Sequence, residues 1–227
     1  MNLQQYKALF IVVTAVLALL VASPAFEHII VYPQTEFFTE LSLLGPDHMA
    51  ENYPYNITPN ESYSVFLGIS NHLGSCAYYQ VDVKFLNETQ SAPDNFNRTS
   101  STLPSLYNVA AFAAYKEDFE LPVTVSFDYS FENVVRTIYT NVTGPGGASQ
   151  NLTVEQRAEN IVMPQAVFHS VTFNGVSLSL AGLSSDFDST RGVFYGNLVF
   201  ELWIYNSTIN AFQYHERFVS LLLNMKK

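Results

Sequence analysis

The sequence predicts an all-β protein, an antiparallel β-sandwich preceded by one transmembrane helix. Two observations lead to this fold class: several segments alternate apolar and polar residues with a period of two, and one uncharged apolar segment stands near the N-terminus. The chain also holds 18 Phe and 14 Tyr but only 13% charged residues. Aromatic and β-branched residues favour strands, and 227 residues suit one domain with an extension.

The N-terminal apolar segment covers residues 8–26, reads ALFIVVTAVLALLVASPAF and has 19 residues without a charge. As a helix it is about 28 Å long, close to the hydrocarbon thickness of a bilayer. Lys7 precedes it and Glu27 follows it, so the positive-inside rule places the short N-terminus inside the cell and the rest outside. The expected organisation is a cytoplasmic N-terminus at 1–7, a signal anchor at 8–26, a linker at 27–36 and an extracellular domain at 37–227.

Two other fates of this segment stay open. A cleaved secretory signal fits the small residues Ser23-Pro24-Ala25 that precede Phe26. A pilin-like signal, cut within Tyr6-Lys7-Ala8-Leu9, fits a hydrophobic helix followed by a β-domain. All three fates export residues 33–227.

Clean alternation predicts strands at 62–71, 78–86, 121–129 and 198–205, because successive side chains of a strand point to opposite faces. The apolar faces of these strands predict the core. Its expected members are Val65, Leu67, Val81, Val83, Val125, Phe127, Phe200 and Leu202. Polar residues such as Lys84 and Glu201 lie on the opposite face.

The remaining segments are assigned from composition and turn signals. Further strands are expected at 37–44, 134–142, 167–180 and 214–224, with a hairpin loop at 206–211 and loops at 88–104 and 144–147. Short helices are expected at 104–115 and 153–162, the second because Thr153 and Gln156 form a capping-box pattern. One domain is the simplest organisation, and a split near residue 100 into two small sandwiches is the alternative.

Seven N-glycosylation sequons follow the apolar segment, where chance gives about three. The acceptor residues are Asn56, Asn60, Asn87, Asn97, Asn141, Asn151 and Asn206. Several fall in turn-like stretches or where alternation ends, which suits glycans because they need exposed positions. The sequence therefore predicts N-linked glycans on an exported domain.

No catalytic, cofactor-binding or metal-binding residues are predicted. The chain lacks the common metalloprotease, nucleotide-binding and serine-nucleophile motifs. His48 and Glu51 lie in a loop-like context, and Asp186 and Asp188 fit a solvated turn better than a calcium loop. The lone Cys76 allows no internal disulfide. A net charge of −10 makes nucleic acid a poor partner.

Two stretches resemble a known family. Residues 37–72 carry a strand ending in Leu-Gly-Pro, a loop with Tyr-Pro and Asn-x-Thr, and a strand ending in Asn-His. Together with the hairpin at 197–225, this pattern resembles the archaeal domain-of-unknown-function 1616 family. The resemblance implies an archaeal membrane protein with an extracytoplasmic Ig-like β-sandwich and no known activity. Residues 88–166 match nothing in that pattern and are interpreted as an insertion.

These observations together predict a non-catalytic, single-pass membrane glycoprotein with a structural or interaction role at the cell envelope. The expected partners are the membrane, N-linked glycans and other envelope or membrane-complex proteins. A pilin-like filament subunit and a surface module that binds sugar or peptide are the alternatives.

Overall fold

The computed structural model describes residues 3–29, 37–87, 89–145 and 152–226. The chain divides into two compact units after Phe37. The first contains helix α1 (Leu3–Ile29). Within the part of α1 whose side chains are described, no stretch is long and apolar enough to span a membrane. Within the predicted span, 8–26, the side chains of residues 8 and 22–26 are not among those described, and most of the predicted linker, 27–36, lies outside the described residues.

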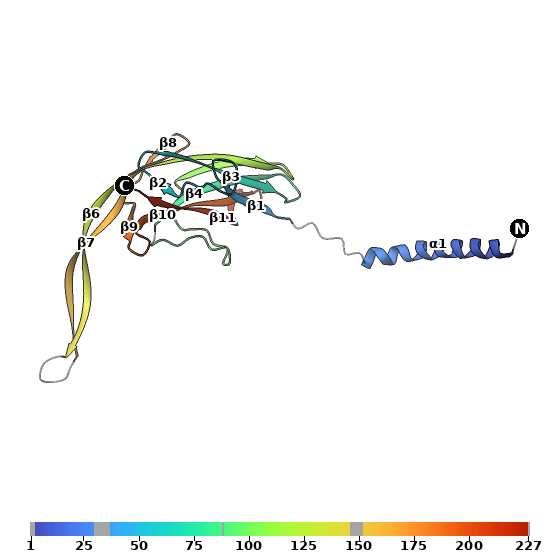
Figure 1. Cartoon of the computed structure of the whole chain (residues 1–227), viewed down its shortest axis with the longest axis horizontal. Coiled ribbons are helices and arrows are strands. Elements are labelled where there is room, and N and C mark those ends of the chain that lie inside the picture. The colour runs from blue at the N-terminus through green and yellow to red at the C-terminus, as the bar shows by residue number, and fades with distance from the viewer. Residues whose placement is uncertain (1–2, 30–36, 88, 146–151, 227) are drawn as a thin grey trace. The chain divides into compact units, whose positions relative to one another are not determined.

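The second unit is all-β, as predicted, and forms a curled sheet of eleven strands (Figure 1). The strands are β1 (Thr39–Leu44), β2 (Asn56–Ile57), β3 (Ser62–Asn71), β4 (Ala77–Leu86), β5 (Tyr107–Ala113), β6 (Asp118–Pro145), β7 (Leu152–Phe173), β8 (Val176–Ser179), β9 (Ser184–Asp188), β10 (Val193–Asn206) and β11 (Ala211–Met225). Residues 38–227 form one unit, so the alternative of two small sandwiches divided near residue 100 is wrong.

The sheet has two leaves that β9 connects. Its order is β1-β3-β6-β7-β9-β10-β11-β2, with β8 beside β7 and with β4 and then β5 beside β10. We call β1, β3, β6, β7 and β8 the first leaf, and β2, β4, β5, β10 and β11 the second leaf. Strand β9 pairs with β7 of the first leaf and with β10 of the second. All pairs are antiparallel except β11 with β2.

The core lies between the two leaves and confirms the predicted faces of the strands. All eight residues predicted for the core are at most 1% exposed. Phe85 of the second leaf packs on two rings of the first leaf, with centroid distances of 4.9 Å to Phe168 and 5.5 Å to Phe127. The alternation therefore identified which side chains of each strand face inward.

Both predicted helices are wrong. Residues 107–113 form β5, which pairs with β4, and residues 152–173 form β7, which pairs with β6 along its whole length. The capping-box pattern at Thr153 is a local signal, and the long β6–β7 pairing overrides it. Range 88–166, which we interpreted as an insertion, is not set apart from the domain, since it supplies β5, all of β6 with the core residue Phe127, and most of β7.

The β-domain has two ends that matter for function. Strand β1 starts at Thr39, opposite the last residue of β3, and loops 72–76, 114–117 and 207–210 lie at this Thr39 end. At the opposite end β6 and β7 continue past their neighbours as a two-stranded arm (Figure 1), so we call it the arm end. Residues 133–145 and 152–164 form the arm, and 133–142 includes the strand expected at 134–142.

Candidate functional site

Three predicted glycan acceptors are exposed in the β-domain. Asn56 lies on the short strand β2, and Asn60 lies in the turn that follows it. Asn60 has a backbone φ of 63°, a left-handed conformation that Asn adopts readily in turns. Asn97 lies in the turn closed by the bridge between Asp94 and Thr99. The amide nitrogens of Asn60 and Asn97 donate to the carboxylates of Asp128 and Asp94, but both contacts lie on the surface and a side-chain rotation releases them.

Two further acceptors are half-buried and their amide nitrogens are engaged. Asn87 Nδ2 donates to the backbone oxygen of Ser184 at 3.0 Å, while Asn87 Oδ1 accepts from the Thr89 hydroxyl at 2.8 Å. Asn206 Nδ2 donates to Gln213 Oε1 at 2.8 Å on the surface. Glycosylation at Asn87 requires breaking a part-buried contact between β4 and β9, whereas Asn206 needs only a side-chain rotation.

The last two acceptors belong to the arm. Asn141 lies on β6, but its side chain is outside the described residues, and Asn151 lies outside them altogether. Sequence reasoning located the sequons correctly but carried no signal that separates Asn87 from Asn60. That separation depends on Ser184, which is 97 residues away along the chain.

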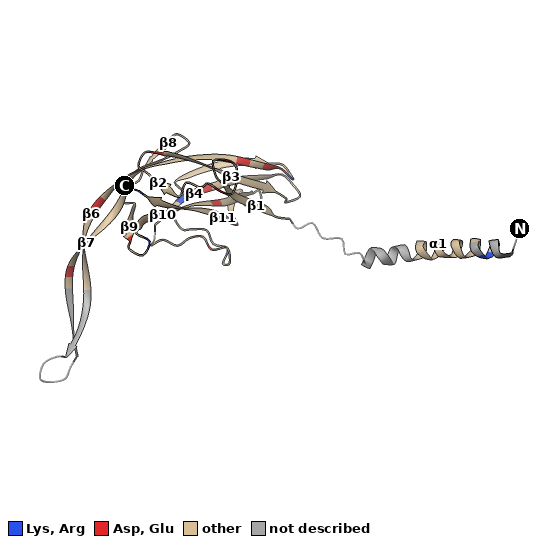
Figure 2. Ribbon diagram, in the orientation of Figure 1, with Lys and Arg blue, Asp and Glu red and all other residues tan. Residues whose placement is uncertain are grey.

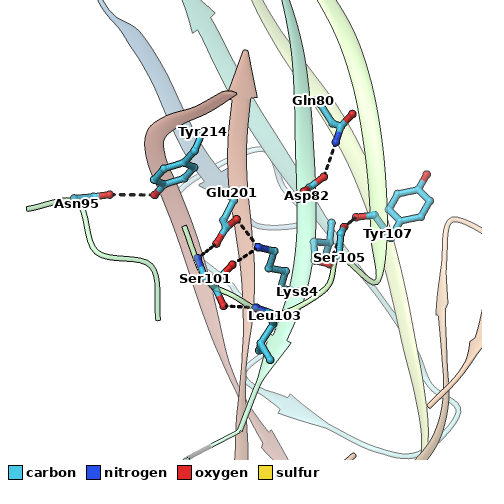
Figure 3. Close-up of polar contacts among 11 residues, drawn as sticks. Gln80, Asp82, Lys84, Asn95, Ser101, Leu103, Ser105, Tyr107, Glu201 and Tyr214 are labelled. Carbon is cyan, nitrogen blue, oxygen red and sulfur yellow. Dashed lines mark hydrogen bonds and ion pairs between the residues drawn. The ribbon is translucent and has the colours of Figure 1, made fainter. Parts of the chain in front are cut away.

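A buried ion pair under a loop was missed by the sequence reasoning. Lys84 and Glu201 lie on the outer face of the second leaf, where alternation put polar residues, yet their side chains are only 4% and 0% exposed. Their charged groups are 2.8 Å apart. Loop 87–106 covers them through Ser101, whose carbonyl accepts from Lys84 at 2.7 Å and whose N–H donates to Glu201 at 2.6 Å (Figure 3).

Aromatic residues surround this ion pair. The Lys84 ammonium lies 6.0 Å from the centroid of the Trp203 ring, and that ring contacts Tyr214 at 5.7 Å. Burial, and then the negative charge of Glu201, raise the pKa of Tyr214 to about 12. Trp203 packs on the strand face, as expected for a tryptophan in this position. The cluster attaches loop 87–106 to the second leaf. Its signal in the sequence was the pair of opposite charges, Lys84 and Glu201, on two strands that the structure places side by side.

A second polar cluster closes the Thr39 end. Asn71 is fully buried, and its amide nitrogen donates to the backbone oxygens of Ser75, Ala113 and Ala114 at 2.9–3.1 Å. Its Oδ1 therefore faces the Tyr79 hydroxyl, which donates to it at 3.2 Å. Asn71 thus connects loop 72–76 with the end of β5.

The direction of these hydrogen bonds decides which ring nitrogen of neutral His215 carries the proton. Because the Tyr79 hydroxyl donates to Asn71, it must accept from Thr39 Oγ1, which lies 2.9 Å away. The Thr39 hydroxyl then accepts from His215 Nε2 at 2.8 Å, so the proton of neutral His215 sits on Nε2. A bulge between Tyr214 and Arg217 of β11, with Glu216 at a φ of 58°, places His215 there. The last strand, expected at 214–224, therefore starts earlier, at Ala211, and His215 lies within it rather than at its start.

Acid is expected to weaken the domain through His215. Burial, and next the positive charge of Arg217, lower the pKa of His215 from its usual 6.5. The unfolded chain then takes up a proton before the folded chain does, so stability falls as pH drops below about 6.5 toward the lowered pKa. His215→Gln keeps a nitrogen donor but cannot titrate. Urea unfolding at about pH 7 and pH 5 should show a smaller acid loss in this variant than in the wild type.

An open groove of about 460 Å³ lies where the arm leaves the domain. Three of its lining residues are Phe131, Phe187 and Phe194. The Phe194 ring contacts the rings of Phe131 and Phe187, with centroid distances of 4.8 and 5.1 Å. Glu132 and Asn133 line the same groove. Aromatic walls with a few polar groups are the usual composition of a ligand site.

The side chains that were weighed as metal ligands contact other groups. Among the described residues, no three His, Cys, Asp or Glu side chains come close enough to hold a metal ion. His48 contacts Glu120 rather than Glu51. Asp186 accepts two hydrogen bonds from the Arg136 guanidinium at 2.8 and 3.1 Å, and Asp188 accepts from the backbone of the turn that follows it.

Comparison with known proteins gives one match. Residues 33–124 match the family described as "Domain of unknown function (DUF1616)". The resemblance predicted for 37–72 is therefore confirmed, whereas the hairpin at 197–225 lies outside the matched range. The match also continues into the range interpreted as an insertion. No curated protein and no solved structure matches the chain.

Proposed function

We propose that this chain, whose residues 33–124 belong to the domain-of-unknown-function 1616 family, is a membrane-anchored glycoprotein with a structural or interaction role at the outer face of an archaeal cell. Residues 8–26 act as a single-pass anchor, and the β-domain stands outside the membrane. The role is non-catalytic. Its partners are the membrane, N-linked glycans and neighbouring proteins of the envelope.

The distribution of the sequons carries this proposal. All seven follow the uncharged apolar segment at 8–26, and the three with fully exposed acceptors, at Asn56, Asn60 and Asn97, occupy turns or a strand edge. Export is the condition for N-glycosylation of a chain with this topology. Nineteen uncharged residues after Lys7 supply the segment that would hold the exported domain at the membrane.

The proposal includes an Ig-like sandwich for the β-domain. Two leaves of mainly antiparallel strands with a shared aromatic core are consistent with this architecture. The arm and the bridging strand β9 would then be additions to it. Such sandwiches serve widely as surface-display and interaction domains, and the fold by itself assigns no activity.

Glycan occupancy is expected to follow the exposure of the acceptors. In full-length protein from the native membrane, glycopeptide mass spectrometry should find Asn56, Asn60 and Asn97 occupied and Asn87 largely bare, because the Asn87 amide is held by Ser184. The protein should also remain in the membrane during a carbonate wash and leave it only with detergent.

Two results would contradict the proposal separately. Release of the full-length protein by carbonate alone would refute the anchor, and three bare exposed acceptors would refute the glycoprotein assignment. N-terminal sequencing of the same sample distinguishes the alternatives. A chain that begins at Phe26 would be secreted, and one that begins at Ala8 or Leu9 would be a pilin-like subunit.

The groove at the base of the arm favours a second candidate function, the binding of sugar or peptide. Its three Phe rings offer faces on which a sugar ring or an apolar side chain can stack, beside the carboxylate of Glu132. Titration with hexose and N-acetylhexosamine oligosaccharides, followed by NMR shifts, would test it. Phe187→Ala should abolish any shifts at the groove, while Phe112→Ala, on the opposite end of the domain, should leave them unchanged.

A further inference from the structure

Four aromatic side chains form a continuous row across the outer face of the second leaf. The row consists of Phe112 on β5, Tyr78 on β4, Tyr205 on β10 and Phe212 on β11. Tyr78 lies opposite Phe112 in the β4–β5 ladder, and Tyr205 lies opposite Phe212 in the β10–β11 ladder. The ring of Tyr78 contacts both Tyr205 and Phe212, with centroids 6.2 and 5.3 Å apart. The row therefore makes one surface rather than four isolated contacts.

This row is open to solvent, unlike the part of the same face at Lys84 and Glu201. Phe112 is 62% exposed, Tyr78 42% and Tyr205 37%. Farther toward the arm end, Ser101 of loop 87–106 covers the face at Lys84 and Glu201. An isolated exposed aromatic residue is unremarkable in a soluble domain, whereas a contiguous row of them marks a contact surface.

The loops beside the row extend its apolar character. Ile209, at the tip of the β10–β11 hairpin, is 52% exposed, and Tyr115, in the turn after β5, is 40% exposed. Loops 72–76 and 207–210 contain no Asp, Glu, Lys or Arg. Asp118 and Glu120 at the start of β6, and Glu40 on β1, belong to the first leaf (Figure 2). The four residues of the row carry no charge, and the charges nearest to them in the second leaf are Lys116 and Glu117 in the turn after β5, where the Lys116 ammonium lies 5.3 Å from the Tyr115 ring.

The chain from α1 enters the β-domain at this same end. Helix α1 ends at Ile29 and β1 starts at Thr39, an interval of 39 − 29 = 10 residues that can span at most about 35 Å. The anchor of the proposed function would thus keep the Thr39 end within that reach of the bilayer. Tyr and Trp favour the membrane–water interface, where an apolar ring and a polar group are both accommodated.

We infer that the aromatic row, together with Ile209 and Tyr115, is a lipid-contact surface that rests on the bilayer interface beside the anchor. This inference deepens the proposed function and depends on its anchor. The attraction is apolar rather than electrostatic, because a chain with net charge −10 gains nothing from anionic headgroups.

The test uses the full chain in vesicles of zwitterionic phosphatidylcholine, with a spin label on Cys76. This exposed thiol is the only cysteine and lies at the Thr39 end, two residues before Tyr78. The control is Cys76→Ser with Asn60→Cys, which moves the label to the arm end. Electron paramagnetic resonance compares how accessible each label is to oxygen, which concentrates in lipid, and to a water-soluble nickel complex. The Cys76 label should shift toward oxygen on reconstitution, and the Asn60 label should not.

Variants identify the surface that causes the shift. Phe112→Ser with Tyr205→Ser should abolish it, whereas Val176→Ser, a matched exposed apolar residue on β8, should not. Thermal unfolding checks that the variants fold. If the protein floats with the vesicles but both labels stay equally exposed to nickel, the lipid-contact surface is refuted and the anchor stands. If the protein does not float with the vesicles, the anchor is refuted and the inference falls with it.

Discussion

Replacing Lys84 with Met is expected to destabilise the β-domain by about 3–5 kcal/mol. The Lys84 ammonium is the positive group beside the Glu201 carboxylate, and both side chains are buried. Met fills most of the space of the lysine stem but leaves the carboxylate without a counter-charge in a region that water does not reach. The stability is lost because the Glu201 carboxylate stays buried without water or a counter-charge. This loss is far larger than the loss expected from breaking an exposed ion pair such as Arg98 with Glu216.

The combination of Lys84→Met with Glu201→Gln provides the matched control. Gln has nearly the shape of Glu and keeps an oxygen that accepts from the Ser101 N–H, but it carries no charge. The double variant should therefore be more stable than Lys84→Met alone, although it contains one more substitution. Urea unfolding followed by far-ultraviolet circular dichroism measures both. A double variant less stable than the single one would show that the ion pair is not the source of the effect.

Loop 87–106 gives a second readout of the same change. Ser101 connects this loop to the second leaf through both members of the pair. In Lys84→Met the loop should become more sensitive to limited proteolysis than the rest of the domain. Arg98→Ala removes only an exposed contact of the same loop with Glu216 and should leave the cleavage rate almost unchanged.

The alternation of residues predicted much of this fold because the core faces of the strands depend on local sequence. Val81 and Val83 are buried and Gln80 and Asp82 are not, because the two pairs lie on opposite faces of β4. Lys84, next in the polar series, is buried because a distant loop covers it. Which part of a polar face becomes covered depends on long-range contacts, and periodicity has no information about them.

The two failed helix predictions have a related cause. Residues 104–115 and 153–162 carry local patterns compatible with helices, but their backbone groups find partners in strands already formed, β4 for the first and β6 for the second. A strand partner is specified by residues far away in the chain. Local propensity amounts to only tenths of a kcal/mol per residue, so tertiary pairing overrides it readily.

The residues that carried the family resemblance have structural roles in this chain. A Cβ on Gly45 of the Leu-Gly-Pro motif would lie 1.9 Å from the backbone oxygen of Glu51, so a side chain cannot be accommodated. The hydroxyl of Tyr53, from Tyr-Pro, donates to the backbone oxygen of Leu43 at 2.7 Å. Asn71, from Asn-His, organises the Thr39 end. The shared pattern therefore describes how the domain is built.

Some features of the candidate sites likewise depend on local sequence, and others depend on residues far apart in the chain. Sequons are local, so all seven acceptors could be identified from the sequence, and the turn context correctly favoured exposure for Asn60 and Asn97. The aromatic row could not be identified, because Phe112, Tyr78 and Tyr205 come from three separate segments. Their alignment depends on the registers of the ladders that join β5, β4 and β10.

Truncating Phe127 or Phe200 to Ala is expected to cost about 3–5 kcal/mol each, which corresponds to a fall of about 6–20 °C in the melting temperature. Both side chains are at most 1% exposed. The Phe127 ring contacts Phe85 and Phe168 at 5.5 and 5.8 Å, so its removal leaves a cavity between the two leaves. Phe200 lies in the centre of the second leaf, between Val83 and Val219. Neither site can collapse without moving strands held by ladder hydrogen bonds on both sides.

Phe112→Ala makes the same chemical change on the outer face. Comparing it with Phe127→Ala and Phe200→Ala therefore shows the effect of burial for one residue type. Because Phe112 is 62% exposed, its truncation removes little buried surface and should change the free energy of unfolding by less than about 1 kcal/mol. Thermal and urea unfolding of the three variants tests the predicted inward and outward faces directly. If Phe127→Ala and Phe200→Ala melted like the wild type while Phe112→Ala did not, the strand faces would be reversed. That result would also remove the aromatic row from the surface, since the row and the core are defined by the same alternation.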